Sequence, residues 1–234
     1  MEINNWTEKN KMQLNPKKTK SMIFNFTKSC QFTTDITVKN EKVEIVDETK
    51  LLGTIITKDL NWNRNTEEIV KDANKRMRML HAASKYTRKI SDLKQIYSAF
   101  IRSKLDHSAV VWHYGLSKLN RQALERVQKS AVRIILKDKF KEYKDGLKYL
   151  NLDNLDERRN KFCLKFAKNC IRNQKLNHIF PLNKNIKREL RKTNKYQINF
   201  ARTDRYMNST IPSLQRLINN HEISRDQILR INGC

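Results

Sequence analysis

The sequence has little glycine and no long apolar run. Its four glycines, Gly53, Gly115, Gly146 and Gly233, are isolated from one another. Loops that cradle nucleotide phosphates, of the dinucleotide-binding or P-loop kind, need closely spaced glycines, so nucleotide-binding enzymes of these two classes are excluded. The longest apolar candidate, residues 109–112, is far shorter than the roughly 18 residues that cross a membrane.

Two further absences indicate the compartment. Residues 1–5 contain no apolar stretch of the kind that opens a secretory leader. The four cysteines, Cys30, Cys163, Cys170 and Cys234, form no CxxC motif, so neither a disulfide framework nor a zinc ribbon is predicted. We expect an intracellular protein of the nucleus or cytoplasm that is not secreted and has no membrane partner. Cys163 and Cys170, on an expected helix, are interpreted as small buried apolar residues.

Groups for acid, metal or nucleophilic chemistry are equally scarce. The adjacent carboxylates Asp47 and Glu48 precede an expected strand and fit a solvated turn better than a metal site. No serine lies in a GxSxG motif. None of the five histidines has a metal-binding spacing; they are His81, His107, His113, His178 and His221. The residues therefore predict a binding module with no metal, no cofactor and no small-molecule substrate.

What the sequence does contain is positive charge. Lys and Arg number 49 against 24 Asp and Glu, which gives a net charge of +25 and a pI near 10.1. Residues 1–60 carry +2, residues 61–156 carry +10 and residues 157–234 carry +13. A polycation of this size repels itself unless a polyanion neutralises it, and nucleic acid is the commonest intracellular polyanion. RNA or DNA is therefore the predicted partner, although a solvated helix face also produces runs of charge.

The hydrophobic pattern changes along the chain. Apolar residues alternate over 21–26, 32–45 and 51–56, which predicts short strands. From residue 63 the spacing becomes helical, with amphipathic helices expected over about 63–85, 91–105 and 120–137.

Beyond these helices we expect a charged linker at 137–148. A helix over 156–173, an irregular basic segment at 181–210 and a short helix at 211–218 follow.

The predicted fold is α+β and predominantly α. A small N-terminal β-hairpin or sheet occupies residues 1–62, a basic helical bundle follows at 63–137, and a helical, partly irregular basic tail occupies 138–234. We expect a helix bundle of this kind to present its charged faces outward.

Several segments, in the same order as in one family, carry matching motifs. The segments are LNPKKTKSMIF (14–24), KLLGTII with LNW (50–56 and 60–62), YSAFIRSKLDHSAVVW (97–112), QKSAVRII (128–135), LDERR (155–159), FPLN (180–183) and RYMNSTIP with LQRLIN (205–212 and 214–219). They resemble the region of non-LTR (LINE-type, jockey/CR1-like) retrotransposon reverse transcriptases that lies beyond the catalytic aspartates. The chain is thus similar to the palm end, thumb and tail of such an RNA-directed DNA polymerase.

The departures from that family decide the expected function. Its catalytic aspartates, two of them in a (Y/F)xDD hairpin, lie upstream of the LNxxKT segment, and this chain contains no DD pair. The resemblance therefore implies a truncated fragment that is not an enzyme and lacks the Mg²⁺ ligands of the parent family. Lys18 matches the family's lysine that protonates the leaving pyrophosphate, and Leu51, Leu52 and Gly53 match its primer-grip strand.

We expect residual, sequence-nonspecific binding of RNA or DNA backbones by basic side chains on the palm edge, thumb and tail. Arg126, Lys129, Arg133 and Lys137 recur at three- and four-residue steps and are the predicted phosphate-tracking stripe. The other candidates are Lys17, Lys20, Arg64, Lys75, Arg158, Arg159, Lys187, Arg188, Arg191 and Lys192.

An alternative remains open. Only 38% of residues are hydrophobic, which is lean for a self-sufficient core. If the core is too small for stable folding, the chain is an inert, marginally folded relic that exposes the apolar surface of a palm. A further alternative is a domesticated scaffold that docks on a partner protein.

Overall fold

The computed structural model describes the backbone of residues 2–26, 36–38, 41–183 and 194–231, and the side chains of 5–26, 36–38, 41–183 and 194–221. The chain divides into two compact units, residues 1–65 and 66–234. The predicted thumb-like and tail regions are therefore parts of one unit. The strand expected over 32–35 lies outside the described residues, as do Cys30 and Cys234.

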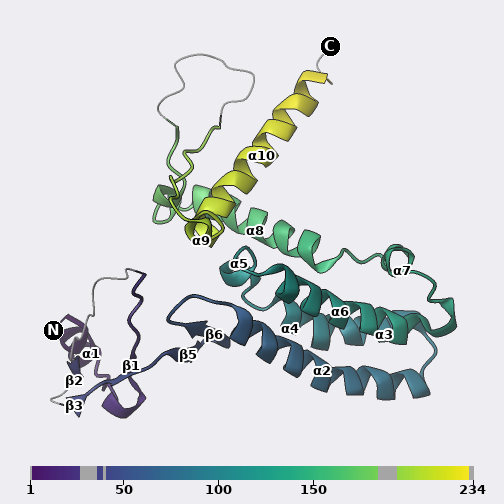
Figure 1. The fold of residues 1–234 in the computed structure, drawn as a ribbon, viewed down its shortest axis with the longest axis horizontal. Helices are drawn as coiled ribbons and strands as arrows, with labels where there is room; N and C mark the ends of the chain where they lie inside the picture. Colours follow the sequence, from purple (N-terminus) through teal and green to yellow (C-terminus); the bar gives the residue numbers. More distant parts are fainter. Residues whose placement is uncertain (1, 27–35, 39–40, 184–193, 232–234) are drawn as a thin grey trace. The chain divides into compact units, whose positions relative to one another are not determined.

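The first unit contains one helix and several very short strands (Figure 1). Its elements are α1 (Glu2–Lys9), a 3₁₀ turn (Pro16–Lys18), β1 (Lys20–Ser21), β2 (Thr37–Val38), β3 (Glu41–Lys42), β4 (Glu44–Ile45), β5 (Glu48–Leu51) and β6 (Thr54–Thr57). β1 pairs in parallel with β4, and β2 pairs antiparallel with β3, as β5 does with β6.

The strand expected over 21–26 is wrong beyond Ser21. Residues 22–26 form no regular structure, and Phe24 and Phe26 are exposed. Among the described side chains of this unit only Thr7, Val43, Thr54 and Asn65 are buried. The described part of this unit thus buries too few apolar side chains to form the layer that would make a strand of Met22, Phe24 and Phe26 stable.

The β5–β6 hairpin replaces the continuous strand expected over 51–56. Leu51 pairs with Thr54, so Leu52 and Gly53 form a two-residue turn. Their φ angles of 47° and 86° are both positive, as a type I′ turn requires. Gly53 takes this conformation without strain, whereas Leu52 does so against its steric preference.

The second unit is helical (Figure 1). Its elements are α2 (Asn63–Tyr86, beginning just before the boundary), α3 (Ile90–Ile96), a π-helical segment (Tyr97–Arg102), α4 (Ser103–Asp106), α5 (Ala109–Trp112), α6 (Lys118–Leu136), a 3₁₀ turn (Lys137–Lys139), α7 (Tyr143–Tyr149), α8 (Leu155–Arg172), a 3₁₀ turn (Asn177–Ile179), α9 (Asp204–Met207) and α10 (Thr210–Ile231). The prediction of an α+β, predominantly α protein is confirmed.

The bundle core follows the predicted periodicity. Side chains from α2, the helical stretch 90–106 and α6 are buried, namely Ala73, Leu80, Leu93, Tyr97, Ile101, Leu105, Leu124, Val127, Ala131 and Ile135. Phe100, which follows the same apolar spacing, is instead 48% exposed. The π-helical segment explains this difference, because its wider turn shifts the following residues around the helix. The Phe100 carbonyl there accepts a 2.8 Å hydrogen bond from Arg76 Nη1 of α2.

The helical stretch 90–106 begins without a side-chain cap. Ser91 lies inside α3, and the N-cap position belongs to Lys89, which makes no side-chain capping bond. α6 begins instead with a true cap, since the Asn120 amide donates to Ser117 Oγ at 3.2 Å.

The tail of this unit has a core of its own. It consists of Cys163, Ala167, Cys170, Phe180, Tyr196, Leu214 and Ile218. Both cysteines are buried, as predicted, and burial raises the pKa of the Cys163 thiol to about 11. α10 is longer than the short helix expected at 211–218, and Pro212 lies in its first turn.

Two amide side chains of α10 fix the extended segment beside it. Asn219 Oδ1 accepts from the Tyr196 amide and Asn219 Nδ2 donates to the Tyr196 carbonyl, both at 2.9 Å. Gln215 accepts from the Asn199 amide at 2.9 Å and donates to the Ile179 carbonyl at 2.8 Å. A helix thus satisfies backbone groups that would otherwise need a neighbouring strand.

α7, which the sequence did not predict, packs closely on the end of α6. A Cβ at Gly146 would lie 2.7 Å from Val132 Cγ1 and 3.2 Å from Leu136 Cδ1. Val132 and Leu136 are buried, and the β-branched Val132 cannot rotate away cheaply. Residues 143–149 are therefore held against α6 instead of forming the expected linker.

Gly146→Ala tests this contact. We expect the free energy of unfolding to fall by about 1–2 kcal/mol, because overpacking outweighs the better helix propensity of alanine. Urea denaturation measures it. Gly115→Ala, at an exposed glycine whose φ is not positive, is the control, and an equal loss in both variants would contradict the role of the close approach.

Candidate nucleic-acid interface

The outer face of α6 carries the predicted basic stripe. Arg126, Lys129 and Arg133 are all exposed. At 100° per residue they lie within an arc of about 60°, and residues on one face three and four apart are neighbours. Among the described residues, none of the three forms an ion pair with a carboxylate. The positive charge of this face is therefore available to a solvent-borne anion.

Lys137, the fourth member of the predicted stripe, lies just past the helix. Its φ of 48° ends α6, and its ammonium donates to the Ser84 carbonyl near the end of α2. The residue remains exposed but is held toward α2. The stripe thus turns at its C-terminal end instead of continuing along the helix axis.

The inner face of α6 is fixed by a buried glutamine. Gln128 is fully buried and accepts from the Tyr97 hydroxyl of the π-helical segment. Its Nε2 donates to the Tyr143 hydroxyl at 2.9 Å and to the Asp153 carbonyl at 3.0 Å. One side chain therefore ties α6 to three other segments and sets which face of the helix points outward. Burial raises the pKa of both tyrosines, so they stay protonated and keep donating.

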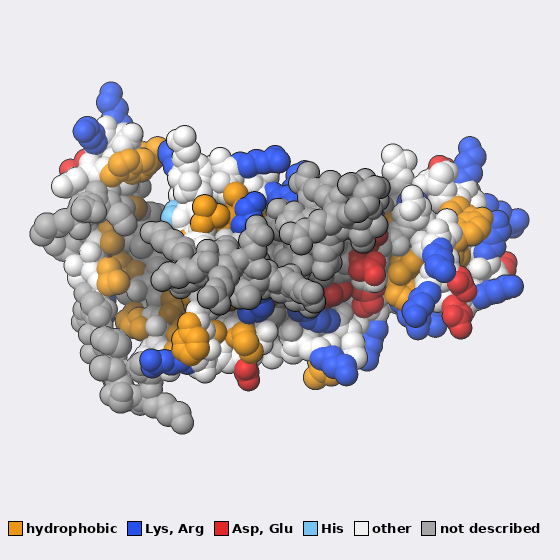
Figure 2. Space-filling model, turned by 90° about the horizontal axis from the view of Figure 1, so that it is seen from above, with side chains coloured by type: hydrophobic (Ala, Val, Ile, Leu, Met, Phe, Trp, Pro, Cys, Tyr) orange, Lys and Arg blue, Asp and Glu red, His pale blue; other side chains and the backbone are white. Residues whose placement is uncertain are grey.

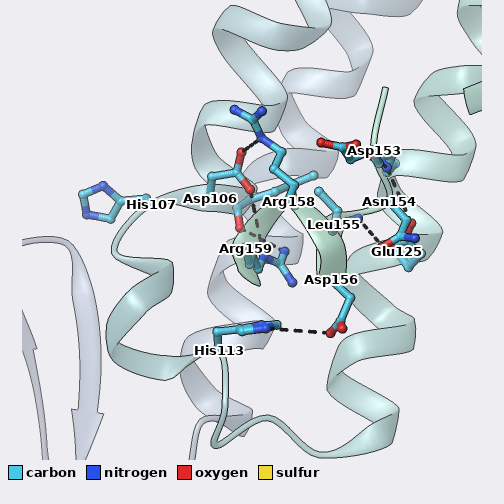
Figure 3. A network of polar contacts seen from close by, with 12 residues as sticks. Asp106, His107, His113, Glu125, Asp153, Asn154, Leu155, Asp156, Arg158 and Arg159 are labelled. Carbon is cyan, nitrogen blue, oxygen red and sulfur yellow. Dashed lines mark hydrogen bonds and ion pairs between the residues drawn. The ribbon is translucent and has the colours of Figure 1, made fainter. Parts of the chain in front are cut away.

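Glu125, one turn earlier, joins the same network (Figure 3). Its carboxylate accepts from the Leu155 amide at 3.1 Å and from the Tyr143 hydroxyl. Burial raises the pKa of Glu125, and these hydrogen bonds oppose that rise. The Leu155 amide is at the first turn of α8, where Asn154 caps the helix by accepting from the Glu157 amide at 2.8 Å. The start of α8 is therefore positioned by α6.

Arg159 corrects a predicted contact. It is 1% exposed, with its guanidinium 4.9 Å above the Trp112 ring and its Nη2 donating to the Leu105 carbonyl at 3.0 Å. Burial lowers its pKa, and the nearby Asp106 opposes that change. Arg159 is thus part of the core, and its assignment to a nucleic-acid-binding surface is wrong.

Arg158 and two basic residues of the first unit are engaged by carboxylates. Arg158 Nε donates to Asp106 Oδ2 at 2.6 Å, as Figure 3 shows. Lys20 lies 3.4 Å from Glu44 and Arg64 lies 3.5 Å from Glu48. Their charge is therefore partly neutralised within the protein, which makes them weaker candidates than the α6 stripe.

The remaining candidate binding residues are either exposed or lie outside the described residues. Lys17 and Lys18 are exposed on the 3₁₀ turn Pro16–Lys18, and Lys75 is exposed on α2. Lys187, Arg188, Arg191 and Lys192 lie outside the described residues.

The primer-grip-like residues form the tip of a hairpin. Leu51 is 58% exposed and Leu52 is 87% exposed, and Gly53 completes the turn. These apolar side chains therefore lie in solvent at the hairpin tip and are not part of a core.

Sequence reasoning missed two exposed aromatic residues that lie among basic ones. Tyr86, at the end of α2, stands next to Lys85 with Arg88 and Lys89 close by, and Tyr149, at the end of α7, follows Lys148. The sequence signal for them is an aromatic residue interleaved with lysine and arginine, which a pattern of charge at helical spacing does not include.

Among the described residues, no group of His, Cys, Asp and Glu side chains is arranged to hold a metal ion. None of the helices in the described ranges has the length and apolar character needed to cross a membrane. Comparison with protein-family models, with curated proteins and with solved structures finds no match.

His113, buried at the end of α5, makes the stability of the second unit depend on pH. Its ring is fully buried, 3.2 Å from Asn160 Oδ1 and 3.9 Å from Asp156 Oδ1. Burial, reinforced by the neighbouring Arg121, lowers its pKa from 6.5 to about 4. Between pH 6.5 and about 4 the imidazole of His113 is therefore protonated in the unfolded chain and neutral in the folded chain. The stabilisation is complete above pH 6.5 and is lost as the pH falls toward 4.

His113→Gln removes this pH-dependent contribution to the free energy of unfolding. The difference in unfolding free energy between the wild type and the variant should shrink by about 3 kcal/mol between neutral pH and pH 4. Urea denaturation over a pH series measures it. His81→Gln, at an exposed histidine of α2, is the control, and an equal change there would assign the effect to histidine loss in general.

Proposed function

We propose that this chain is a non-catalytic module, similar to the palm end, thumb and tail of a non-LTR retrotransposon reverse transcriptase, that binds RNA or DNA without sequence preference. The observation that carries the proposal is the outward basic face of α6, formed by Arg126, Lys129 and Arg133. Each of these side chains is exposed, and the helix that presents them is fixed by the buried Gln128. A rigid row of unneutralised cations suits a row of phosphates.

The charge distribution supports the same proposal. Residues 61–234 carry +23 of the net +25. Such an excess destabilises the compact protein and is relieved when a polyanion binds. Contacts to phosphates position a nucleic acid without reading its bases, so the binding is sequence-independent and salt-dependent.

We propose that the module is non-catalytic because of its sequence. Phosphoryl transfer by the family it resembles needs paired aspartates that hold two metal ions, and this chain has no DD pair. Lys18, which matches the lysine that serves the leaving group, lies on an exposed turn. The proposed activity is therefore retention of a nucleic acid and not its extension.

The triple variant Arg126→Gln, Lys129→Gln, Arg133→Gln tests the stripe. If each residue contacts one phosphate, the slope of log affinity against log salt on duplex DNA should become shallower by about 2–3. Fluorescence anisotropy titrations over a range of salt concentrations give the slope for each protein.

A matched variant separates local contacts from total charge. Lys42→Gln, Lys50→Gln, Lys58→Gln removes the same three charges from exposed positions of the first unit. We expect its salt slope to equal that of the wild type. Equal slopes for both triple variants would mean that net charge, and not the α6 stripe, governs binding, and a wild type that does not bind at low salt would reject the proposal altogether.

The inert-relic alternative is favoured by one observation, the thin core of the first unit. The second unit argues against it, because its helices bury Trp112, Tyr97 and many aliphatic side chains. We expect the full chain to show a cooperative thermal transition in far-ultraviolet circular dichroism, dominated by the second unit. A gradual, featureless loss of signal would favour the relic.

A further inference from the structure

One end of the second unit combines basic side chains with exposed aromatic rings. We name this end the basic pole and define it as residues 84–89 and 133–149. It contains nine Lys and Arg residues against three carboxylates, Asp138, Glu142 and Asp145. Figure 2 shows Lys and Arg side chains around hydrophobic ones at its right-hand end, where α7 and the ends of α2 and α6 lie in Figure 1.

Specific contacts join the two segments of the basic pole. The Lys137 ammonium donates to the Ser84 carbonyl, two residues before Tyr86. Two residues after Lys137, Lys139 Nζ lies 3.4 Å from the Tyr149 hydroxyl and 5.7 Å from the centre of its ring. The 3₁₀ turn Lys137–Lys139 therefore links the end of α2 to the end of α7.

The basic pole is also rigidly built. Gly146 allows α7 to approach Val132 and Leu136 of α6 closely, as described above. The guanidinium of Arg133 lies 5.2 Å above the Phe140 ring. Cation–π pairs of this geometry order both partners, so the last turn of the α6 stripe and the aromatic residues form one surface.

Two tyrosines of this surface face solvent. Tyr86 is 92% exposed and Tyr149 is 59% exposed. Neither ring contributes to the core, and large aromatic side chains left in solvent among cations are the composition of single-strand-binding surfaces. Each base of an unpaired strand offers a flat face to such a ring while its phosphate meets a neighbouring lysine or arginine.

We propose that the basic pole binds single-stranded RNA or DNA, with Tyr86 and Tyr149 as platforms on which unpaired bases stack. The inference rests on the proposed function and deepens it, since Arg133 and Lys137 belong to both surfaces. A duplex keeps its bases stacked inside and offers the tyrosines nothing but its edges. The α6 stripe serves either form of nucleic acid, and the basic pole distinguishes a single strand from a duplex.

The test compares two probes and two double variants of the full chain. The probes are oligouridine and a nucleic-acid duplex of equal charge, titrated at one low salt concentration by fluorescence anisotropy. Tyr86→Ala with Tyr149→Ala removes both rings, and Tyr86→Phe with Tyr149→Phe keeps the rings without the hydroxyls. We expect the alanine variant to bind oligouridine about 10- to 100-fold more weakly, with duplex affinity unchanged, and the phenylalanine variant to bind as the wild type does.

Other outcomes overturn the inference in distinguishable ways. If the wild type binds neither probe, the proposed function fails and the inference fails with it. If the wild type binds both probes and the alanine variant loses neither or loses both equally, only the role of the tyrosines fails. If polyglutamate displaces oligouridine and its own binding falls equally in the alanine variant, the basic pole recognises an acidic polypeptide instead. The single variant Tyr86→Ala guards against misfolding, because this side chain is almost wholly in solvent.

Discussion

The second unit depends on the hydrogen bonds of one buried side chain, Gln128. Its amide and carbonyl groups are satisfied by the Tyr97 hydroxyl, the Tyr143 hydroxyl and the Asp153 carbonyl, which come from three different segments. A buried amide without partners would cost several kcal/mol, so these hydrogen bonds favour the arrangement in which all three segments meet at Gln128. That arrangement turns the apolar and amide face of α6 inward. It consequently leaves the face with Arg126 and Lys129 to solvent, and the basic surface is a result of how the interior is hydrogen-bonded.

The helices of the second unit were predictable because a repeated apolar spacing reports directly on burial. Leu80, Leu105 and Leu124 follow the apolar spacing of the predicted helices, and all three are buried. Arg159 was not predictable in this way, since its position in the sequence resembles that of any exposed helical arginine. Its burial depends on Trp112 and on the Leu105 carbonyl, about 50 residues earlier in the chain. A local pattern reports a charge but not the distant partner that makes its burial tolerable.

The strand expected over 21–26 in the first unit was wrong for the opposite reason. Its alternating apolar residues are typical of strands, yet a strand is stable only when a neighbour and an apolar layer are both present. Phe24 and Phe26 belong to no strand and remain about half exposed. The β5–β6 hairpin did form, because a two-residue turn at Leu52–Gly53 makes its pairing local. Among the candidate binding residues, Arg126, Lys129 and Arg133 are exposed on α6. Arg158 and Arg159 of α8 instead contact Asp106 and the Leu105 carbonyl, which lie more than 50 residues earlier in the chain.

The described residues before and after positions 184–193 are hydrogen-bonded to each other. The Asn183 amide donates to the Lys195 carbonyl at 3.0 Å and the Gln197 amide donates to the Pro181 carbonyl at 2.9 Å, while Asn219 holds Tyr196 from behind. Because Asn219 bonds both backbone groups of Tyr196, the pairing of residues 181–183 with 195–197 is attached directly to α10. One amide side chain thereby anchors two separate stretches of the tail, and an exchange of Asn219 would remove this attachment of both to α10.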